Sequence, residues 1–131
     1  TGVLVVTVPN DFSALQKCLL EHNQINHPFW IALPDHLAYF DRTSLEATAR
    51  ATGWRTATTM ADFPIDWFLV HSGSNYVRNR ELGPEAHRAR ISLENLLAEQ
   101  PVAQVNKFYE AMAQVGMGRD ITAFLIPEAR K

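Results

Sequence analysis

The sequence predicts one α/β domain, and three features of the chain lead to this expectation. β-branched and apolar residues fill 3–8, a second apolar run fills 121–126, and stretches with helical periodicity lie between them. Strands that alternate with helices are typical of folds in which helices pack on a sheet in two or three layers. With 131 residues, 47% of them hydrophobic, the chain can form one such core over residues 1–131.

Composition excludes several classes of function. Twelve basic and fourteen acidic residues give a net charge of -2, without the positive footprint that nucleic acid or an anionic membrane attracts. The single cysteine allows no internal disulfide and no cysteine zinc cluster, and the five histidines lack metal-ligand spacing. The longest apolar run is far below the ~20 residues of a membrane-spanning helix. We therefore expect a soluble cytoplasmic protein without nucleic-acid, membrane or metal partners.

The first expected element is a strand over 3–8, which is β-branched or apolar at nearly every position. Such continuous runs are typical of strands that helices cover on both faces. Asn10 follows the strand, and Asp11 or Ser13 then caps a helix. One side of that helix carries apolar residues, namely Phe12, Leu15, Cys18 and Leu19. This spacing predicts that Cys18 is buried.

A long aromatic connection over 23–41 leads to a helix with clear boundaries. Connections of this length in compact domains are either functional or disordered, and the aromatic content favours a packed loop. Thr43 and Glu46 have the spacing of a capping box, which places the first helical turn there. Gly53 ends the helix, because glycine adopts the left-handed conformation after a helix without steric cost.

The second half of the chain predicts a strand, a helix pair and a last strand. Residues 54–61 form a Thr-rich strand, whereas 65–70 are either more strand or a buried loop. The glycine-proline pair at 83–84 starts one helix, and Pro101 opens the next. Their expected inner sides carry Ala86, Ala89, Leu93, Leu96 and Leu97, and then Val102, Val105, Tyr109 and Met112. Residues 120–127 form the final strand.

Three segments of the chain resemble one enzyme family. They are the strand Gly2-Val-Leu-Val-Val-Thr-Val-Pro-Asn, the loop Pro34-Asp-His-Leu-Ala-Tyr-Phe-Asp, and the Ser-Leu-Glu helix that ends in Ala51-Thr-Gly-Trp. Together they are similar to the C-terminal half of class I S-adenosylmethionine-dependent methyltransferases, most strongly over 2–62. The resemblance implies a partial Rossmann-like methyltransferase sheet: the last three strands, mixed in direction, with the final strand antiparallel and helices flanking. Residues 64–118 are then an insertion that contains the helix pair.

The same resemblance implies a parent enzyme whose main cofactor-binding half lies outside this chain. Family members bind S-adenosylmethionine through a glycine-rich loop, whereas no Gly-x-Gly-x-x-Gly or Gly-x-Gly-x-Gly sequence occurs here. The chain also enters a core strand almost directly after Thr1, which is typical of a cut within a fold. We therefore expect a fragment, inactive alone, of an enzyme that transfers a methyl group to a small-molecule acceptor.

By resemblance, the loop at 34–41 faces the cleft for cofactor and acceptor. His36 is the expected catalytic residue, which orients the acceptor or takes its proton. In the alternative, His36 hydrogen-bonds a backbone carbonyl and fixes the loop. The expected acceptor-binding residues are Asn10, Trp30, Asp35, Tyr39 and Phe40. Their alternative roles are a turn for Asn10 and core packing for Trp30 and Phe40.

A second interpretation of the chain is a non-enzymatic α/β interaction domain. The helix pair at 84–116 would then pack on another chain, or the edge of the first strand would pair with a second copy. A Ser-His-Asp triad from Ser44, His36 and Asp35 is excluded, because no Gly-x-Ser-x-Gly elbow follows a strand. The arginines at 78, 80, 88 and 90 either meet an anionic partner or form a solvated helix face.

Overall fold

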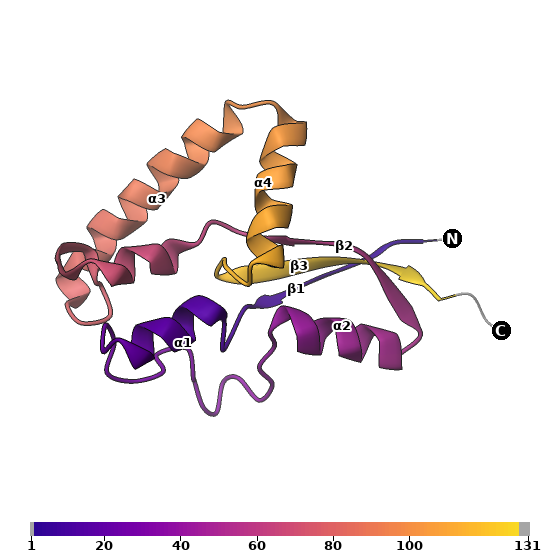
Figure 1. Ribbon diagram of the computed structural model, residues 1–131, viewed down its shortest axis with the longest axis horizontal. Helices are drawn as coiled ribbons and strands as arrows, with labels where there is room; N and C mark the ends of the chain where they lie inside the picture. The colour runs from indigo at the N-terminus through magenta and orange to yellow at the C-terminus, as the bar shows by residue number, and fades with distance from the viewer. Residues whose placement is uncertain (1, 129–131) are drawn as a thin grey trace.

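The computed structural model describes residues 2–128. In chain order its elements are β1 (Leu4–Pro9), α1 (Ala14–Glu21), α2 (Arg42–Ala51), β2 (Trp54–Ala61), the 3-10 helices η1 (Ile65–Val70), η2 (Ser72–Ser74) and η3 (Arg80–Leu82), then α3 (Gly83–Ala98), α4 (Val102–Gln114) and β3 (Asp120–Pro127). Figure 1 shows this α/β arrangement, with helices flanking one sheet. Thr1, where the sequence indicates a cut, lies outside the described residues.

The three strands form one sheet in the order β1-β3-β2. The last strand lies in the middle: Ala123 pairs with Val6 of β1 on one side and with Thr59 of β2 on the other. Both ladders are antiparallel, so β1 and β2 run in the same direction without touching. The expected antiparallel final strand is therefore confirmed, whereas the expected mixture of parallel and antiparallel pairing is wrong within these strands.

Helices cover both faces of the sheet, as Figure 1 shows for α2 and α4. The face toward α2 holds the main core, in which Leu45 and Ala49 of α2 meet Ile121, Ala123 and Leu125 of β3. Every second residue of β3 is buried there, which is the period of a strand with one covered face. The opposite side carries α4, which packs on β2.

The start of α2 differs from the predicted capping box. Asp41 is the N-cap: its carboxylate accepts a hydrogen bond from the Ser44 amide at 2.8 Å, and the Ser44 hydroxyl accepts one from the Asp41 amide at 3.0 Å. The helix thus begins at Arg42, one residue before Thr43, and Glu46 instead pairs with Arg42. The predicted end is confirmed, since Gly53 has a φ of 83° directly after the last helical turn.

β1 is not covered on both faces, contrary to the sequence prediction. It is an edge strand, and its side chains Val3, Leu4 and Val5 are 63%, 39% and 52% exposed. Only the second half of the strand, at Val6 and Val8, packs against the α2 core. Within residues 2–128, the first half of the apolar pattern at 3–8 therefore stays exposed.

A second apolar cluster lies beyond one end of the sheet. Leu19 of α1, Ile25, Trp30 and Leu69 of η1 form its buried centre. The alternative of further strand at 65–70 is therefore wrong: a 3-10 helix supports this cluster. Two predicted members of the α1 face are also wrong, because Phe12 precedes the helix with a φ of 56° and Cys18 is exposed.

The helix pair leaves much of its predicted inner side uncovered. Ala86 is buried, but Leu93 and Leu96 of α3 are 41% and 56% exposed, and Val102 at the start of α4 is 72% exposed. Figure 1 shows the reason: α3 leads away from the sheet and returns only through α4. The prediction of one continuous packed face on each helix is therefore wrong for these three residues.

Candidate functional site

The ends of the three strands meet beside α1, at the side where β1 and β2 finish. The Asn10 amide donates to the Arg119 carbonyl at 2.8 Å, and the Asp62 amide donates to the Asp120 carbonyl at 3.2 Å. Because β1 and β2 run in the same direction, their carboxyl ends lie at the same end of the sheet. Open α/β sheets bind ligands at such carboxyl ends.

Asn10 holds this end of the sheet together. It is 2% exposed, and its side-chain nitrogen donates to the carbonyl of Gly118 at 3.0 Å and, at 3.5 Å, to that of Gly116. Its backbone forms an isolated parallel bridge to Phe40. The Asn10 amide group is thus engaged within the fold, as the turn interpretation requires, and acceptor binding by Asn10 stays a prediction.

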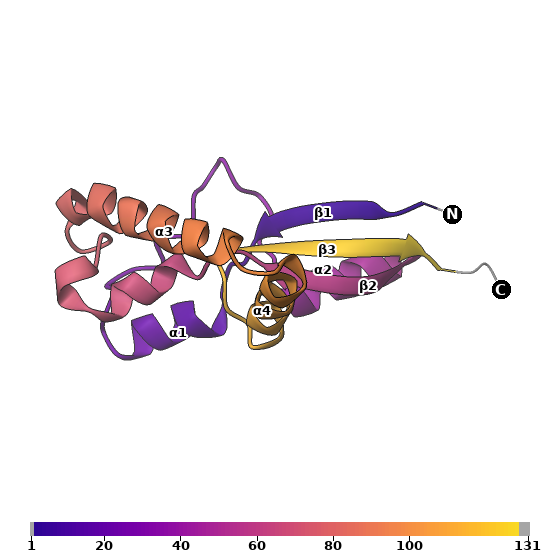
Figure 2. The ribbon, with the colours of Figure 1, turned by 90° about the horizontal axis from the view of Figure 1, so that it is seen from above.

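The loop before α2 is held by its own backbone and leaves His36 at the surface. The His36 amide donates to the Ala32 carbonyl at 2.8 Å, and the Ala32 amide donates to the Tyr39 hydroxyl at 3.1 Å. Asp35 is exposed as well. Figure 2 shows that this loop rises beyond β1, on the side of the sheet edge that no strand covers.

His36 and Phe40 share a small cavity of about 160 Å³ with Val8, Pro9, Asp11 and Ala38. We call it the His36 cavity. Tyr39 lies beside it, with its ring centre 6.2 Å from that of His36. The cavity is smaller than the ~300 Å³ at which small-molecule pockets usually begin. It can therefore hold only part of a ligand.

Trp30, in contrast, belongs to the core. It is 2% exposed, and Phe12 separates it from the His36 cavity, with ring centres 5.7 Å from Trp30 and 6.1 Å from Tyr39. The packing interpretation of Trp30 thus agrees with its burial. Its indole nitrogen has no hydrogen-bond partner among the described residues.

Two charged residues that the sequence prediction omits connect the ends of the strands. Arg119 Nη1 lies 3.3 Å from the carboxylate of Asp11, which is 2% exposed. The same guanidinium stands over the Phe29 ring, 5.6 Å from its centre, a cation–π arrangement. Arg119 directly precedes a predicted strand and Asp11 follows another by three residues, and these positions are the only signal in the sequence that marks them.

A buried carboxylate lies further along the same side. Asp66 of η1 is 4% exposed and accepts a hydrogen bond from the Tyr76 hydroxyl at 3.0 Å. Burial raises the pKa of Asp66, while Arg119 opposes that rise. Burial also raises the pKa of Tyr76, with the Asp66 charge adding to the effect, so Tyr76 stays a neutral donor. In the sequence, Asp66 is marked by being the one charged residue in the apolar run at 65–70.

Asp62 joins the end of β2 to the start of β3. Burial raises its pKa to about 6, although its Oδ1 accepts hydrogen bonds from the amides of Arg119 at 2.5 Å and Asp120 at 2.8 Å. Gly118 must lack a side chain here, because a Cβ would lie 2.5 Å from that of Ala61 and its φ is 97°. This corner fixes Arg119 relative to both outer strands.

A larger recess opens on the outer side of Tyr76. It measures about 410 Å³ and is lined by His27, Phe29, Tyr76, Val77, Arg80 and Gly83. We call it the aromatic recess. Arg119 contacts Phe29, which lines the recess, and Asp11, which lines the His36 cavity. The two hollows are therefore linked through the side chains of Phe29, Arg119 and Asp11.

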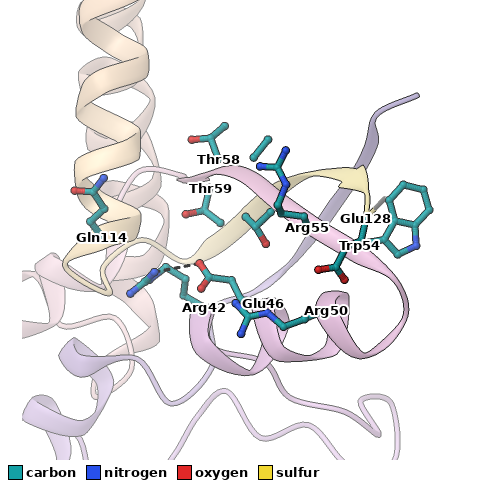
Figure 3. Close-up of a pocket in the computed structure, with 11 residues that line it drawn as sticks. Arg42, Glu46, Arg50, Trp54, Arg55, Thr58, Thr59, Gln114 and Glu128 are labelled. Carbon is teal, nitrogen blue, oxygen red and sulfur yellow. Dashed lines mark hydrogen bonds and ion pairs between the residues drawn. The ribbon is translucent and has the colours of Figure 1, made fainter. Parts of the chain in front are cut away.

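A trough of about 600 Å³ lies away from this end, between α2 and β2. Figure 3 shows Arg42, Glu46 and Arg50 along α2 and Arg55 on the strand. Arg42 pairs with Glu46 at 3.1 Å, and Arg50 lies in the last helical turn, where a positive charge complements the helix dipole. Contacts within the protein thus account for two of the three arginines, and we assign the trough no ligand.

Compared with protein families, curated proteins and solved structures, the chain matches none. Within residues 2–128, no group of three His, Cys, Asp or Glu side chains converges as a metal site would require. No helix in that range is both long and apolar enough to cross a membrane. The geometry of the strand ends is therefore the main indication of function.

Proposed function

We propose that the chain is the acceptor-side part of an S-adenosylmethionine-dependent methyltransferase that transfers a methyl group to a small molecule. The observation that carries the proposal is the sheet: β3 runs antiparallel between β1 and β2, which share one direction. The resembled family has a final strand of this antiparallel kind. Asn10, Phe40 and the His36 cavity lie at the carboxyl end of β1, where such sheets bind ligands, whereas Trp30 lies in the core.

The uncovered edge of β1 also supports this proposal. Val3, Leu4 and Val5 form an exposed apolar edge beside the projecting loop, in which Leu33 and Leu37 are 72% and 86% exposed. Soluble proteins rarely leave such strand edges open. A strand that continues the sheet outward from β1 would cover this surface, as expected for the last strands of a larger sheet.

The residues present here do not form a site for the whole cofactor. The His36 cavity is about 160 Å³, below the usual range of ligand pockets, and no glycine-rich phosphate loop occurs in the sequence. In the proposal this chain supplies acceptor contacts. His36 at the surface would orient the acceptor's nucleophile or accept its proton, and much of the rate enhancement would come from alignment.

The test is calorimetric titration of S-adenosylhomocysteine into this chain and into a longer protein that includes the coding sequence upstream of it. We expect binding by the longer protein and none by the chain alone. The control is the longer protein with an unrelated exposed histidine changed, His87→Asn, which should bind equally well. Absence of binding to the longer protein overturns the proposal.

A second candidate function, an interaction domain, is favoured by the exposed leucines of α3. Leu93 and Leu96 lie on a helix that leads away from the sheet, and Val102 follows at the turn between the helices. The double variant Leu93→Gln with Leu96→Gln of the longer protein distinguishes the two functions. Under the methyltransferase proposal, calorimetry should show that the variant still binds S-adenosylhomocysteine. Under the interaction-domain proposal, sedimentation should show that the variant no longer self-associates.

A further inference from the structure

The aromatic recess has the size and lining of a small-molecule site. Its volume of about 410 Å³ falls within the ~300–1,000 Å³ typical of such pockets. Phe29, Tyr76 and Val77 supply apolar surface, while His27 and Arg80 supply polar groups. Two aromatic rings beside a few polar groups suit a planar ring and fix its orientation.

Arg80 differs from the other arginines of its segment in having no partner. The Arg78 side chain donates to the Asn23 carbonyl, Arg88 pairs with Glu85, and Arg90 lies 3.6 Å from Glu94. The Arg80 guanidinium makes no hydrogen bond or ion pair with any residue in 2–128, although the Arg80 carbonyl accepts a hydrogen bond from the Gly83 amide. Arg80 alone of the four lines the recess. An arginine in this position offers a planar fork that matches a carboxylate in two parallel hydrogen bonds.

The other polar groups of the recess indicate how a ligand would be oriented. His27 Nδ1 lies 2.6 Å from the Asn26 side-chain oxygen, so Nδ1 donates and Nε2 accepts hydrogen bonds when the ring is neutral. Behind Tyr76 lies the buried carboxylate of Asp66. A negative charge placed against Tyr76 would be repelled by Asp66, so a ligand carboxylate belongs at Arg80 and a donor group at His27.

We infer that the aromatic recess binds an aromatic monocarboxylate, with its ring against Phe29 and Tyr76 and its carboxylate on Arg80. Its role as the methyl acceptor rests on the proposed function, whereas the binding itself does not. The contacts of Arg119 with Phe29 and Asp11 link the recess to the side of the molecule where the proposal puts methyl transfer. The recess thereby narrows the acceptor to one chemical class.

The experiment is calorimetric titration of 4-hydroxybenzoate into the chain. We expect saturable binding that weakens about tenfold or more for 4-hydroxybenzyl alcohol, which lacks the carboxylate, and for cyclohexanecarboxylate, which lacks the aromatic ring. Arg80→Gln should weaken 4-hydroxybenzoate binding about tenfold or more, equivalent to ~1.4 kcal/mol. The matched control, Arg88→Gln, removes an equally exposed arginine outside the recess and should bind like the unmodified chain.

Three results would overturn the inference: no binding of 4-hydroxybenzoate up to about 10 mM, equal binding of cyclohexanecarboxylate, or equal binding by Arg80→Gln. Thermal unfolding of both variants checks that neither loss comes from misfolding. The outcome is separable from that of the proposed function. If the chain binds 4-hydroxybenzoate but the longer protein does not bind S-adenosylhomocysteine, the inferred ligand of the recess stands and the methyltransferase proposal falls. If the longer protein binds S-adenosylhomocysteine but the chain does not bind 4-hydroxybenzoate, the methyltransferase proposal stands and the inferred ligand falls.

Discussion

The two outer edges of the sheet are built differently. The β2 edge carries Arg55, three threonines and a bulge between Thr56 and Thr58 that interrupts its ladder. The β1 edge has a regular ladder, no charged side chain, and exposed Val3, Leu4 and Val5. Charges and bulges are the devices by which proteins keep sheet edges from pairing. β2 thus carries two of these protective devices, whereas β1 carries neither within residues 2–128.

The largest effect on stability should come from a change in β3, the central strand with which both edge strands pair. Leu125 is 3% exposed and packs against α2, so Leu125→Ala should cost about 2–5 kcal/mol of unfolding free energy. Val5→Ala on β1 should cost less than about 0.5 kcal/mol, because Val5 is 52% exposed. Urea unfolding measures both. Should Leu125→Ala fail to fold, Leu125→Met keeps the volume and should cost under about 1.5 kcal/mol.

The same pair of variants sharpens the comparison in the longer protein. If an added strand covers β1, Val5→Ala should there cost more than about 1 kcal/mol, since the methyl groups it removes become buried. An unchanged small cost would contradict the idea that β1 is built for cover.

The next effect concerns pH and the anchor of β2. Asp62 has a pKa of about 6 in the fold against an ordinary value of 3.8, so the folded state holds this proton more tightly than the unfolded state. Stability from this group is therefore full below about pH 4 and falls as the pH rises to about 6. Asp62→Asn keeps the acceptor oxygen. At pH 7 its free energy of unfolding should be higher than that of the unmodified chain by on the order of 1 kcal/mol, after allowance for the partial exposure of Asp62.

Chemical unfolding at pH 4 to 7 tests this expectation, with the exposed Asp35→Asn as control. The gap between Asp62→Asn and the unmodified chain should open with rising pH, and the control should show no such gap. Parallel pH curves for all three proteins would show that Asp62 carries no net cost in the fold.

Two substitutions with the smallest expected effect on stability compare the two edges most directly. Val5→Lys places a charge on the β1 edge and Ala57→Lys places one on the β2 edge, both at exposed positions. Each should change the unfolding free energy of the chain by less than about 0.5 kcal/mol. Light scattering should nevertheless show less self-association for Val5→Lys alone. Equal behaviour of the two variants would mean that the edges do not differ in this respect.

Local patterns predicted the strands and helices well where the cause is local. Gly53 ends α2 as expected, because only a residue tolerant of positive φ fits that position. The start of α2 was missed by a short distance, because Asp41 and not Thr43 is the N-cap. The bridge between Asn10 and Phe40 holds the backbone directly before this cap. That contact is tertiary, and no pattern near the helix contains it.

The site was harder to predict for the same reason. The loop with His36 and Phe40 has a local aromatic pattern, and these two residues do line one cavity. Arg119 and Asp11 meet across the sheet from positions far apart in the chain, and Tyr76 reaches Asp66 only because η1 folds against α1. The exposure of β1 was also unforeseeable, because burial depends on what lies beside a strand as well as on its own residues.

The central position of β3 sets the order in which the sheet can be completed during synthesis. β1 and β2 do not touch each other, so neither has a hydrogen-bonded neighbour until β3 leaves the ribosome. Between Ala61 and Asp120 the ribosome must add 58 further residues, a delay of roughly 3–12 s at ordinary translation rates. During that interval the nascent chain carries two unpaired strands, of which β1 is apolar.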